Sequence, residues 1–215
     1  VVVTGQSFGN AYSFGGSGES TGAIRTTSWL NPIDTSDTSV IGAGQHFQLD
    51  IWFNSDDAAQ KATLFSDGGV GTGFSINQDG NTLRVLLKDG SGPAGTFNLA
   101  GGTVVQDQWM KATLKVNPVD DDLSLLIDDV EVASNSGGTI GDFTGLNHTA
   151  IADDNGSQLG GGTFGGTNND GSDYYSAFTG DIASVEVAIV PEPAAFTLIF
   201  GGLAILFVGS RRRRA

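Results

Sequence analysis

"FQLDIWF", residues 47–53, alternates apolar and polar side chains along its whole length. Successive side chains of a β-strand point to opposite faces, so this stretch has one apolar face and one polar face. The apolar face holds Phe47, Leu49, Ile51 and Phe53, and the other holds Gln48, Asp50 and Trp52. A strand with one apolar face indicates an antiparallel sheet that packs one side against a partner.

The same alternation recurs in four further stretches. They are "LRVLLK" (83–88), "WMKATLKV" (109–116), "LSLLID" (123–128) and "ASVEVAIV" (183–190). Turn-forming pairs lie at strand ends, namely Asp67-Gly68, Asp79-Gly80, Asp89-Gly90 and Asn117-Pro118. No stretch before residue 190 has a clear helical period. The pattern predicts an all-β fold, an antiparallel β-sandwich of the jelly-roll type.

The charge of the chain excludes several classes of partner. The chain has 215 residues and a net charge of −14, and residues 1–190 carry 6 Lys and Arg against 23 Asp and Glu, a net charge of −17. Such an acidic body repels phosphates, so we expect no nucleic acid partner. The chain has no cysteine, which excludes disulfides and thiolate chemistry.

The end of the chain has a different character. Residues 194–210 contain no charged side chain, and four arginines follow directly, Arg211, Arg212, Arg213 and Arg214. These 17 residues are at the short end of the roughly 17 to 25 that span a bilayer. The arginines are typical of a stop signal that stays in the cytoplasm. We therefore expect a single C-terminal transmembrane helix, the alternative being a helix buried in the domain.

Val190, Pro191, Glu192 and Pro193 precede this span. The order of Pro-Glu-Pro, apolar span and arginines resembles the PEP-CTERM sorting signal. The resemblance implies export in a Gram-negative-type bacterium and an inner-membrane precursor held through residues 194–210. It implies that an exosortase recognises Pro191, Glu192 and Pro193 and removes the tail. The product would then reach the cell surface or the extracellular matrix.

Residues 8–190 resemble the LamG-like, concanavalin A-like jelly-roll superfamily. The features that carry this resemblance are Trp52, Gly73-Phe74-Ser75-Ile76, Trp109, Ile127-Asp128, and Phe178 with Gly180 and Ile182. Asp128-Asp129 departs from the usual Asp-Gly or Asn-Gly and leaves the turn type open. The expected organisation is a jelly-roll ectodomain over 1–189 and a sorting signal over 190–215. That signal divides into the motif 190–193, the transmembrane helix 194–210 and the basic tail 211–215.

Enzymes of this fold supply a test for catalysis. Glucanases carry Glu-x-Asp-x-x-Glu on one strand, and no such string occurs here. Residues 1–190 contain only three glutamates, Glu19, Glu131 and Glu186, and a nucleophile elbow of the Gly-x-Ser-x-Gly kind is absent. His46 and His148 are the only histidines, and we expect both at the surface. The sequence predicts a protein that is not an enzyme.

Acidic loops indicate calcium, which prefers six to eight oxygen ligands. The best candidates lie in the loop 168–173, at Asn168, Asp170 and Asp173, and next at Asp153 and Asn155. LamG-like domains often hold one structural calcium ion, so the resemblance implies the same cofactor here. The alternative is that these are acidic turns that keep the protein soluble.

Aromatic side chains beside polar ones are typical of sugar-binding sites. The candidates are Trp52, Tyr174 and Tyr175. The predicted function is a lectin-like carbohydrate-binding module of the cell surface or matrix whose partner is extracellular polysaccharide. The alternatives are a structural or adhesive matrix protein without a sugar site and a divergent glycan hydrolase.

Overall fold

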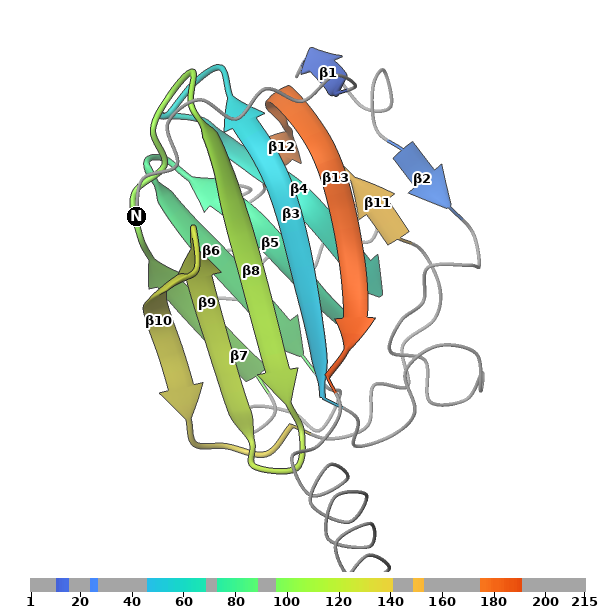
Figure 1. Ribbon diagram of the computed structural model, residues 1–215, viewed down its shortest axis with the longest axis vertical. Helices are drawn as coiled ribbons and strands as arrows, with labels where there is room; N and C mark the ends of the chain where they lie inside the picture. The colour runs from blue at the N-terminus through green and yellow to red at the C-terminus, as the bar shows by residue number, and fades with distance from the viewer. Residues whose placement is uncertain are drawn as a thin grey trace, which may run out of the picture.

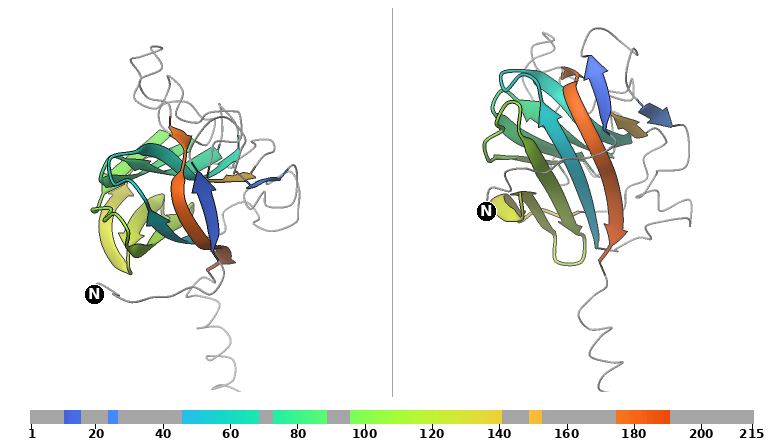
Figure 2. Two further views of the ribbon diagram at one scale, coloured as in Figure 1. Left: turned by 90° about the horizontal axis from the view of Figure 1, so that it is seen from above. Right: turned by 45° about the horizontal axis from the view of Figure 1, so that its top comes forward.

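Two antiparallel β-sheets packed face to face form the computed structural model of the protein (Figure 1). Figure 2 shows the two layers from above and from an oblique angle. All thirteen strands of the described residues belong to these two sheets. The structure describes residues 11–15, 24–26, 46–68, 73–88, 96–140, 149–152 and 175–190. The predicted antiparallel sandwich is confirmed.

The six-stranded sheet has the strand order β1-β13-β3-β8-β9-β10 and lies in front in Figure 1. Its strands are β1 (Tyr12–Gly15), β3 (Phe47–Ser55), β8 (Trp109–Asn117), β9 (Asp122–Ile127), β10 (Val130–Ser136) and β13 (Thr179–Ile189). The last strand, β13, lies between β1 and β3 (Figure 2), so this sheet joins the two ends of the described chain. Such non-local pairing is typical of jelly rolls.

The seven-stranded sheet lies behind it and has the order β2-β11-β4-β5-β6-β7, with β12 paired to β4. Its strands are β2 (Ile24–Thr26), β4 (Lys61–Gly68), β5 (Gly73–Asp79), β6 (Thr82–Lys88), β7 (Thr96–Gly101), β11 (Thr149–Ile151) and β12 (Ser176–Ala177). The short strand β12 pairs parallel to β4, whereas the other pairs are antiparallel.

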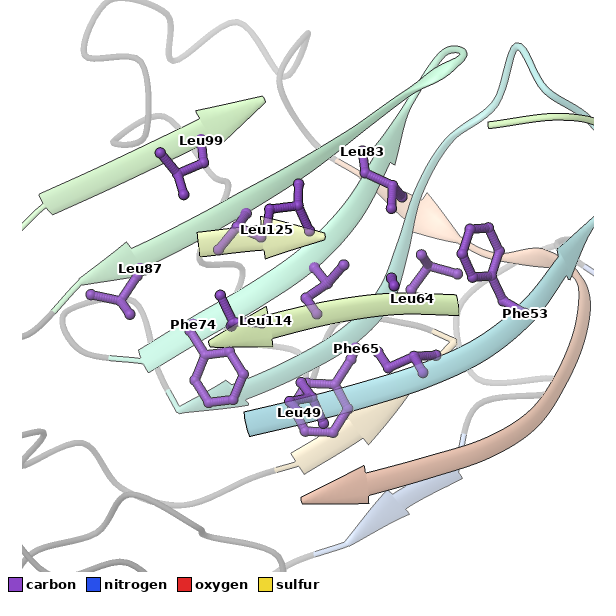
Figure 3. Packing of buried hydrophobic residues seen from close by; sticks show 14 of the residues in the cluster. Leu49, Phe53, Leu64, Phe65, Phe74, Leu83, Leu87, Leu99, Leu114 and Leu125 are labelled. Atoms are coloured by element: carbon purple, nitrogen blue, oxygen red, sulfur yellow. The ribbon is translucent and has the colours of Figure 1, made fainter. Parts of the chain in front are cut away.

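One hydrophobic core fills the space between the sheets, with leucine and phenylalanine side chains from both (Figure 3). The alternation of β3 is confirmed, because its burial alternates residue by residue from Phe47 to Ser55. Phe74 lies between two partners, 5.7 Å from Phe47 and 5.5 Å from Phe65 between ring centroids. Rings at these separations gain attraction beyond the burial of their area. The core therefore links β3 directly to β4 and β5.

The last strand departs in part from the predicted pattern. Val185 and Val187 pack against the core as expected, but Ile189 is exposed. A β-bulge between Ile182 and Ser184 shifts the alternation, so Ile182 is buried as well. The predicted face of Val185, Val187 and Ile189 is therefore confirmed, since Ile189 lies opposite buried Phe47, and the alternation fails only at Ala183, where the bulge lies.

The structure defines the type of one predicted turn and places a residue of another in a strand. Asp128 and Asp129 connect β9 to β10 as a two-residue loop, with φ of 49° and 66°. Positive φ at both positions makes a type I′ turn, which resolves the open question of its type. Asp67, expected in a turn, lies instead inside β4 and is only 2% exposed.

The predicted tail lies outside the described residues. This applies to the motif Pro191, Glu192 and Pro193, to the span 194–210 and to the arginines 211–214. Within the described part of the chain, no helix is long and apolar enough to cross a membrane.

Candidate ligand-binding surface

The outer face of the six-stranded sheet, meaning the side that points away from the core, carries rows of polar side chains. Residues opposite each other on neighbouring antiparallel strands point to the same face. Asp50 of β3 lies opposite Glu186 of β13 and Thr113 of β8. Trp52 lies in the next row, opposite Ser184 and Lys111. Gln48 lies in the row on the other side of Asp50, opposite Ala188 and Lys115.

Asp50 is half-buried and held from two sides. The Gln48 amide Nε2 donates a hydrogen bond of 2.7 Å to Asp50 Oδ2, and the Thr113 hydroxyl donates to Oδ1. The sequence places Asp50 on the polar face of its strand, and the structure in addition holds its carboxylate in one orientation. A carboxylate with fixed hydrogen bonds is a preorganised acceptor.

Asp50 and Glu186 form a pair of carboxylates that sequence analysis missed. Their strands are far apart in the chain, and only the antiparallel pairing of β3 and β13 places them opposite each other. Two like charges directly opposite each other repel. A ligand that supplies hydrogen-bond donors between the two carboxylates reduces this repulsion. Glu186 is exposed and therefore reachable. No signal inside either strand indicates this pairing.

The two described aromatic candidates lie on opposite sides of the sandwich. Trp52 is half-buried on the outer face of the six-stranded sheet. Tyr175 packs against Leu86 of β6, apart from the main core. Its hydroxyl donates to Asp79 Oδ2 at 3.5 Å, and Asp79 also pairs with Arg84 at 2.9 Å. Trp52 and Tyr175 therefore do not share one site, and Tyr174 lies outside the described residues.

The predicted calcium ligands, Asn168, Asp170, Asp173, Asp153 and Asn155, also lie outside the described residues. Within the residues that are described, no three His, Asp or Glu side chains cluster as a metal site would require. His46, expected at the surface, is half-buried at the start of β3.

The comparisons with known proteins come from the structure, because no protein-family model and no curated protein matches the sequence. Domains LG4-5 of the mouse laminin α1 chain match with a TM-score of 0.56 at 11% identity, covering 84% of this chain and 41% of that one. The chain thus spans less than half of that laminin structure.

Two other neighbours are of comparable similarity. The SAP-like pentraxin of Limulus polyphemus matches with a TM-score of 0.52 at 12% identity, covering 86% of this chain and 79% of that one. The CBM40 of the Ruminococcus gnavus IT-sialidase, bound to α2,6 sialyllactose, matches with a TM-score of 0.51 at 14% identity. That match covers 79% of this chain and 94% of the CBM40. These neighbours show that this chain folds as a jelly-roll sandwich.

Proposed function

We propose that this protein is an exported, lectin-like module that binds extracellular polysaccharide on the outer face of its six-stranded sheet. The observation that carries the proposal is Trp52 beside the held carboxylate of Asp50, with Glu186 exposed opposite. An indole face and fixed hydrogen-bonding groups on one surface suit a sugar, whose rings have apolar C–H faces and polar edges. A saccharide bound to a domain of the same fold supports this assignment.

The binding test replaces Trp52 and Glu186 separately. Trp52→Ala should weaken binding to an immobilised panel of neutral and acidic polysaccharides at least about tenfold, because it removes the stacking surface. Glu186→Gln should weaken it less, since the amide keeps one acceptor oxygen. Tyr12→Ala, at an exposed position on β1 of the same sheet, is the matched control. Wild-type protein that binds none of the panel contradicts the proposal.

The outer face also supports the choice of binding over hydrolysis. Directly opposite residues on β3 and β13 have Cβ atoms about 4.5–5.5 Å apart, which lets the Asp50 and Glu186 carboxyl groups reach the roughly 5–5.5 Å between the carboxyl groups of a retaining glycosidase. However, Glu186 is exposed, and both oxygens of Asp50 accept hydrogen bonds within the sheet. The acid of a glycosidase is typically held in an apolar, water-poor site. Release of reducing ends that is lost in Glu186→Gln would establish a hydrolase instead.

The sorting part of the proposal concerns residues 190–215. An exosortase recognises Pro191, Glu192 and Pro193, and residues 194–210 hold the precursor in the inner membrane until the tail is removed. Deletion of 190–215 should release the domain into the medium, whereas replacing the three motif residues by alanine should leave it in the membrane. A motif variant that matures normally contradicts this part and leaves the binding proposal standing.

The calcium part of the proposal assigns one structural ion to the loop 168–173, with Asp153 and Asn155 as the alternative ligands. Calcium added after chelation should raise the melting temperature, and Asp170→Asn should remove that rise. An unchanged melting temperature contradicts the site. A protein that binds neither sugar nor calcium would instead be the structural or adhesive matrix protein.

A further inference from the structure

A pocket of about 290 Å³ opens where β3 begins and β8 ends. Its polar lining comes from three strands and the residue before β3, namely His46, Gln48, Lys115, Asn117, Asp122 and Ser124. The pocket also includes Val190, whose backbone N–H donates to the His46 carbonyl at 2.9 Å. It therefore lies beside the last described residue of the chain.

His46, which lines the pocket, has a buried side-chain nitrogen that lacks a partner. His46 Nε2 is shielded from solvent and makes no hydrogen bond with the described residues. Buried polar atoms are paired in the large majority of cases, so a ligand in the pocket would satisfy this nitrogen if the His46 ring turned toward it. An imidazole nitrogen either donates or accepts a hydrogen bond, which suits a hydroxyl group.

Some of the other polar side chains that line the pocket make hydrogen bonds within the protein, and some do not. Asn117 Oδ1 accepts from the backbone N–H groups of Val119 and Asp120, and its Nδ2 donates to Asp120, so this amide holds the turn after β8. In contrast, the side chains of Lys115, Asp122 and Ser124 make no hydrogen bond or ion pair with other described residues. They are free to contact a ligand.

The unused groups include donors and acceptors, and their charges cancel. Lys115 donates, Asp122 accepts, and Ser124 and His46 can do either. Neighbouring hydroxyls of a sugar ring both donate and accept, which this set matches, whereas an anion would face the Asp122 carboxylate. The volume is at the small end of the roughly 300–1,000 Å³ of ligand pockets, so it suits a small ligand. We infer that the pocket binds one ring of a neutral sugar through two adjacent hydroxyls.

This inference rests on the proposed function and specifies how a saccharide chain would run along β3. Gln48 lines the pocket and shares the outer face of β3 with Asp50 and Trp52. At about 3.4 Å per residue, Trp52 lies roughly 14 Å along the strand from Gln48. One saccharide chain would therefore hold one ring in the pocket while further rings cross Asp50 toward Trp52.

The test uses the chain of residues 1–215 in a detergent without a sugar headgroup. Saturation-transfer NMR and calorimetric titration are run with glucose, galactose, mannose and glucuronate. We expect one of the neutral sugars to bind, and Asp122→Asn and Lys115→Met to weaken it about 10- to 100-fold, as loss of a charged hydrogen bond does. Glu131→Gln and Lys61→Met are the matched controls and should stay within about twofold. The His46 side-chain ¹⁵N resonances should shift with the sugar.

Each other outcome overturns a stated part. If Trp52→Ala abolishes polysaccharide binding while Asp122→Asn and Lys115→Met leave it unchanged, the pocket inference fails and the proposed function stands. If glucuronate binds in preference and Lys115→Met removes it, the choice of a neutral sugar is wrong. If the wild-type chain binds no sugar or polysaccharide, both proposals fall.

Discussion

The two ends of β3 differ in how their polar side chains are used. At the end of the strand, Ser55 and Gln78 are both 0% exposed, and their polar groups are paired. The Ser55 hydroxyl donates to Gln78 Oε1 at 2.9 Å, and Gln78 Nε2 donates to the Asp57 carbonyl at 2.9 Å. Gln60 Nε2 joins this closed end to β13 through the Thr179 carbonyl, at 2.9 Å. At the start of the strand, the open end, His46 Nε2 has no partner among the described residues, and at the closed end Asn54 Oδ1, outside the Ser55–Gln78 pair, also lacks one.

This difference separates stability from recognition. The hydrogen bonds among Ser55, Gln78 and Gln60 rigidify the closed end, whereas an unpaired buried atom such as His46 Nε2 or Asn54 Oδ1 costs free energy unless a ligand satisfies it. The closed end ties β3, β5 and β13 together, and the open end leaves groups available beside a pocket. The strand β3 thus contributes to stability at one end and to ligand recognition at the other, because the two ends lie about 30 Å apart at full extension.

The largest expected effect tests whether the two ends share one core. Phe47→Ala at the open end and Phe53→Ala at the closed end should each lower the free energy of unfolding by about 3–5 kcal/mol. Phe47 packs on Phe74, and Phe53 meets Phe178 edge-on with ring centroids 6.3 Å apart. Urea unfolding measures the loss. Tyr12→Ala, 68% exposed, should change it by less than about 0.5 kcal/mol. A large loss at one end alone would mean that the core is not shared.

The next effect concerns the close approach of β13 to β3 at the closed end. Gly180 has a φ of 139°, and a Cβ there would lie 2.2 Å from the Asn54 carbonyl oxygen. Gly180→Ala should cost about 1–3 kcal/mol from the backbone conformation, with the clash in addition. Gly15→Ala is the matched control, since a Cβ at that position meets nothing within 4 Å. Equal melting temperatures for both variants would contradict the close approach.

Removing a hydroxyl should distinguish the two ends directly. Ser55→Ala leaves Gln78 Oε1 without its donor, so we expect a loss of about 1–3 kcal/mol. Ser124→Ala in the pocket removes a hydroxyl that has no partner among the described residues and should cost less than about 0.5 kcal/mol. The two urea midpoints provide the measurement, and a costly Ser124→Ala would remove the contrast.

His46→Phe should act in the opposite direction. The substitution replaces a ring with an unpaired buried nitrogen by an apolar ring of similar shape. The free energy of unfolding should therefore stay constant or rise by up to about 1 kcal/mol. Sugar binding in the pocket should fall in the same variant. A marked loss of stability would show that His46 Nε2 supports the fold.

The smallest effect concerns the turn after β9. Asp129 has a φ of 66°, a conformation that glycine adopts without cost. Relief of the left-handed conformation, about 1–2 kcal/mol, outweighs the backbone entropy cost of glycine, about 0.5–1 kcal/mol, so Asp129→Gly should raise the free energy of unfolding by roughly 0.5–1 kcal/mol. The same change removes the 2.5 Å pair with Lys111 Nζ, which contributes little because Asp129 is 77% exposed. Lys111→Met isolates that contribution, and a stability loss in Asp129→Gly equal to that of Lys111→Met would contradict the expected gain.

Much of the fold was predictable because strand periodicity is a local property. The alternation of "FQLDIWF" placed Phe47, Leu49, Ile51 and Phe53 in the core and Trp52 on the outer face, as the structure confirms. The bulge in β13 was not visible in the sequence, because its signal is a change of pairing between two strands. Asp67 was assigned to a turn because its neighbour Gly68 favours one, yet pairing with Phe74 keeps it in β4.

The candidate site required the tertiary structure. Periodicity assigns Asp50, Trp52 and Glu186 to the same kind of surface but says nothing about which strands are neighbours. Pairing of β3 with β13 and β8 brings Glu186 to Asp50 and Lys115 to Gln48, while Tyr175 goes to the other sheet. A strand's own residues decide its two faces through the geometry of the pleat. Its neighbours are decided by contacts between segments distant in the chain, and these depend on the packing of the whole sandwich.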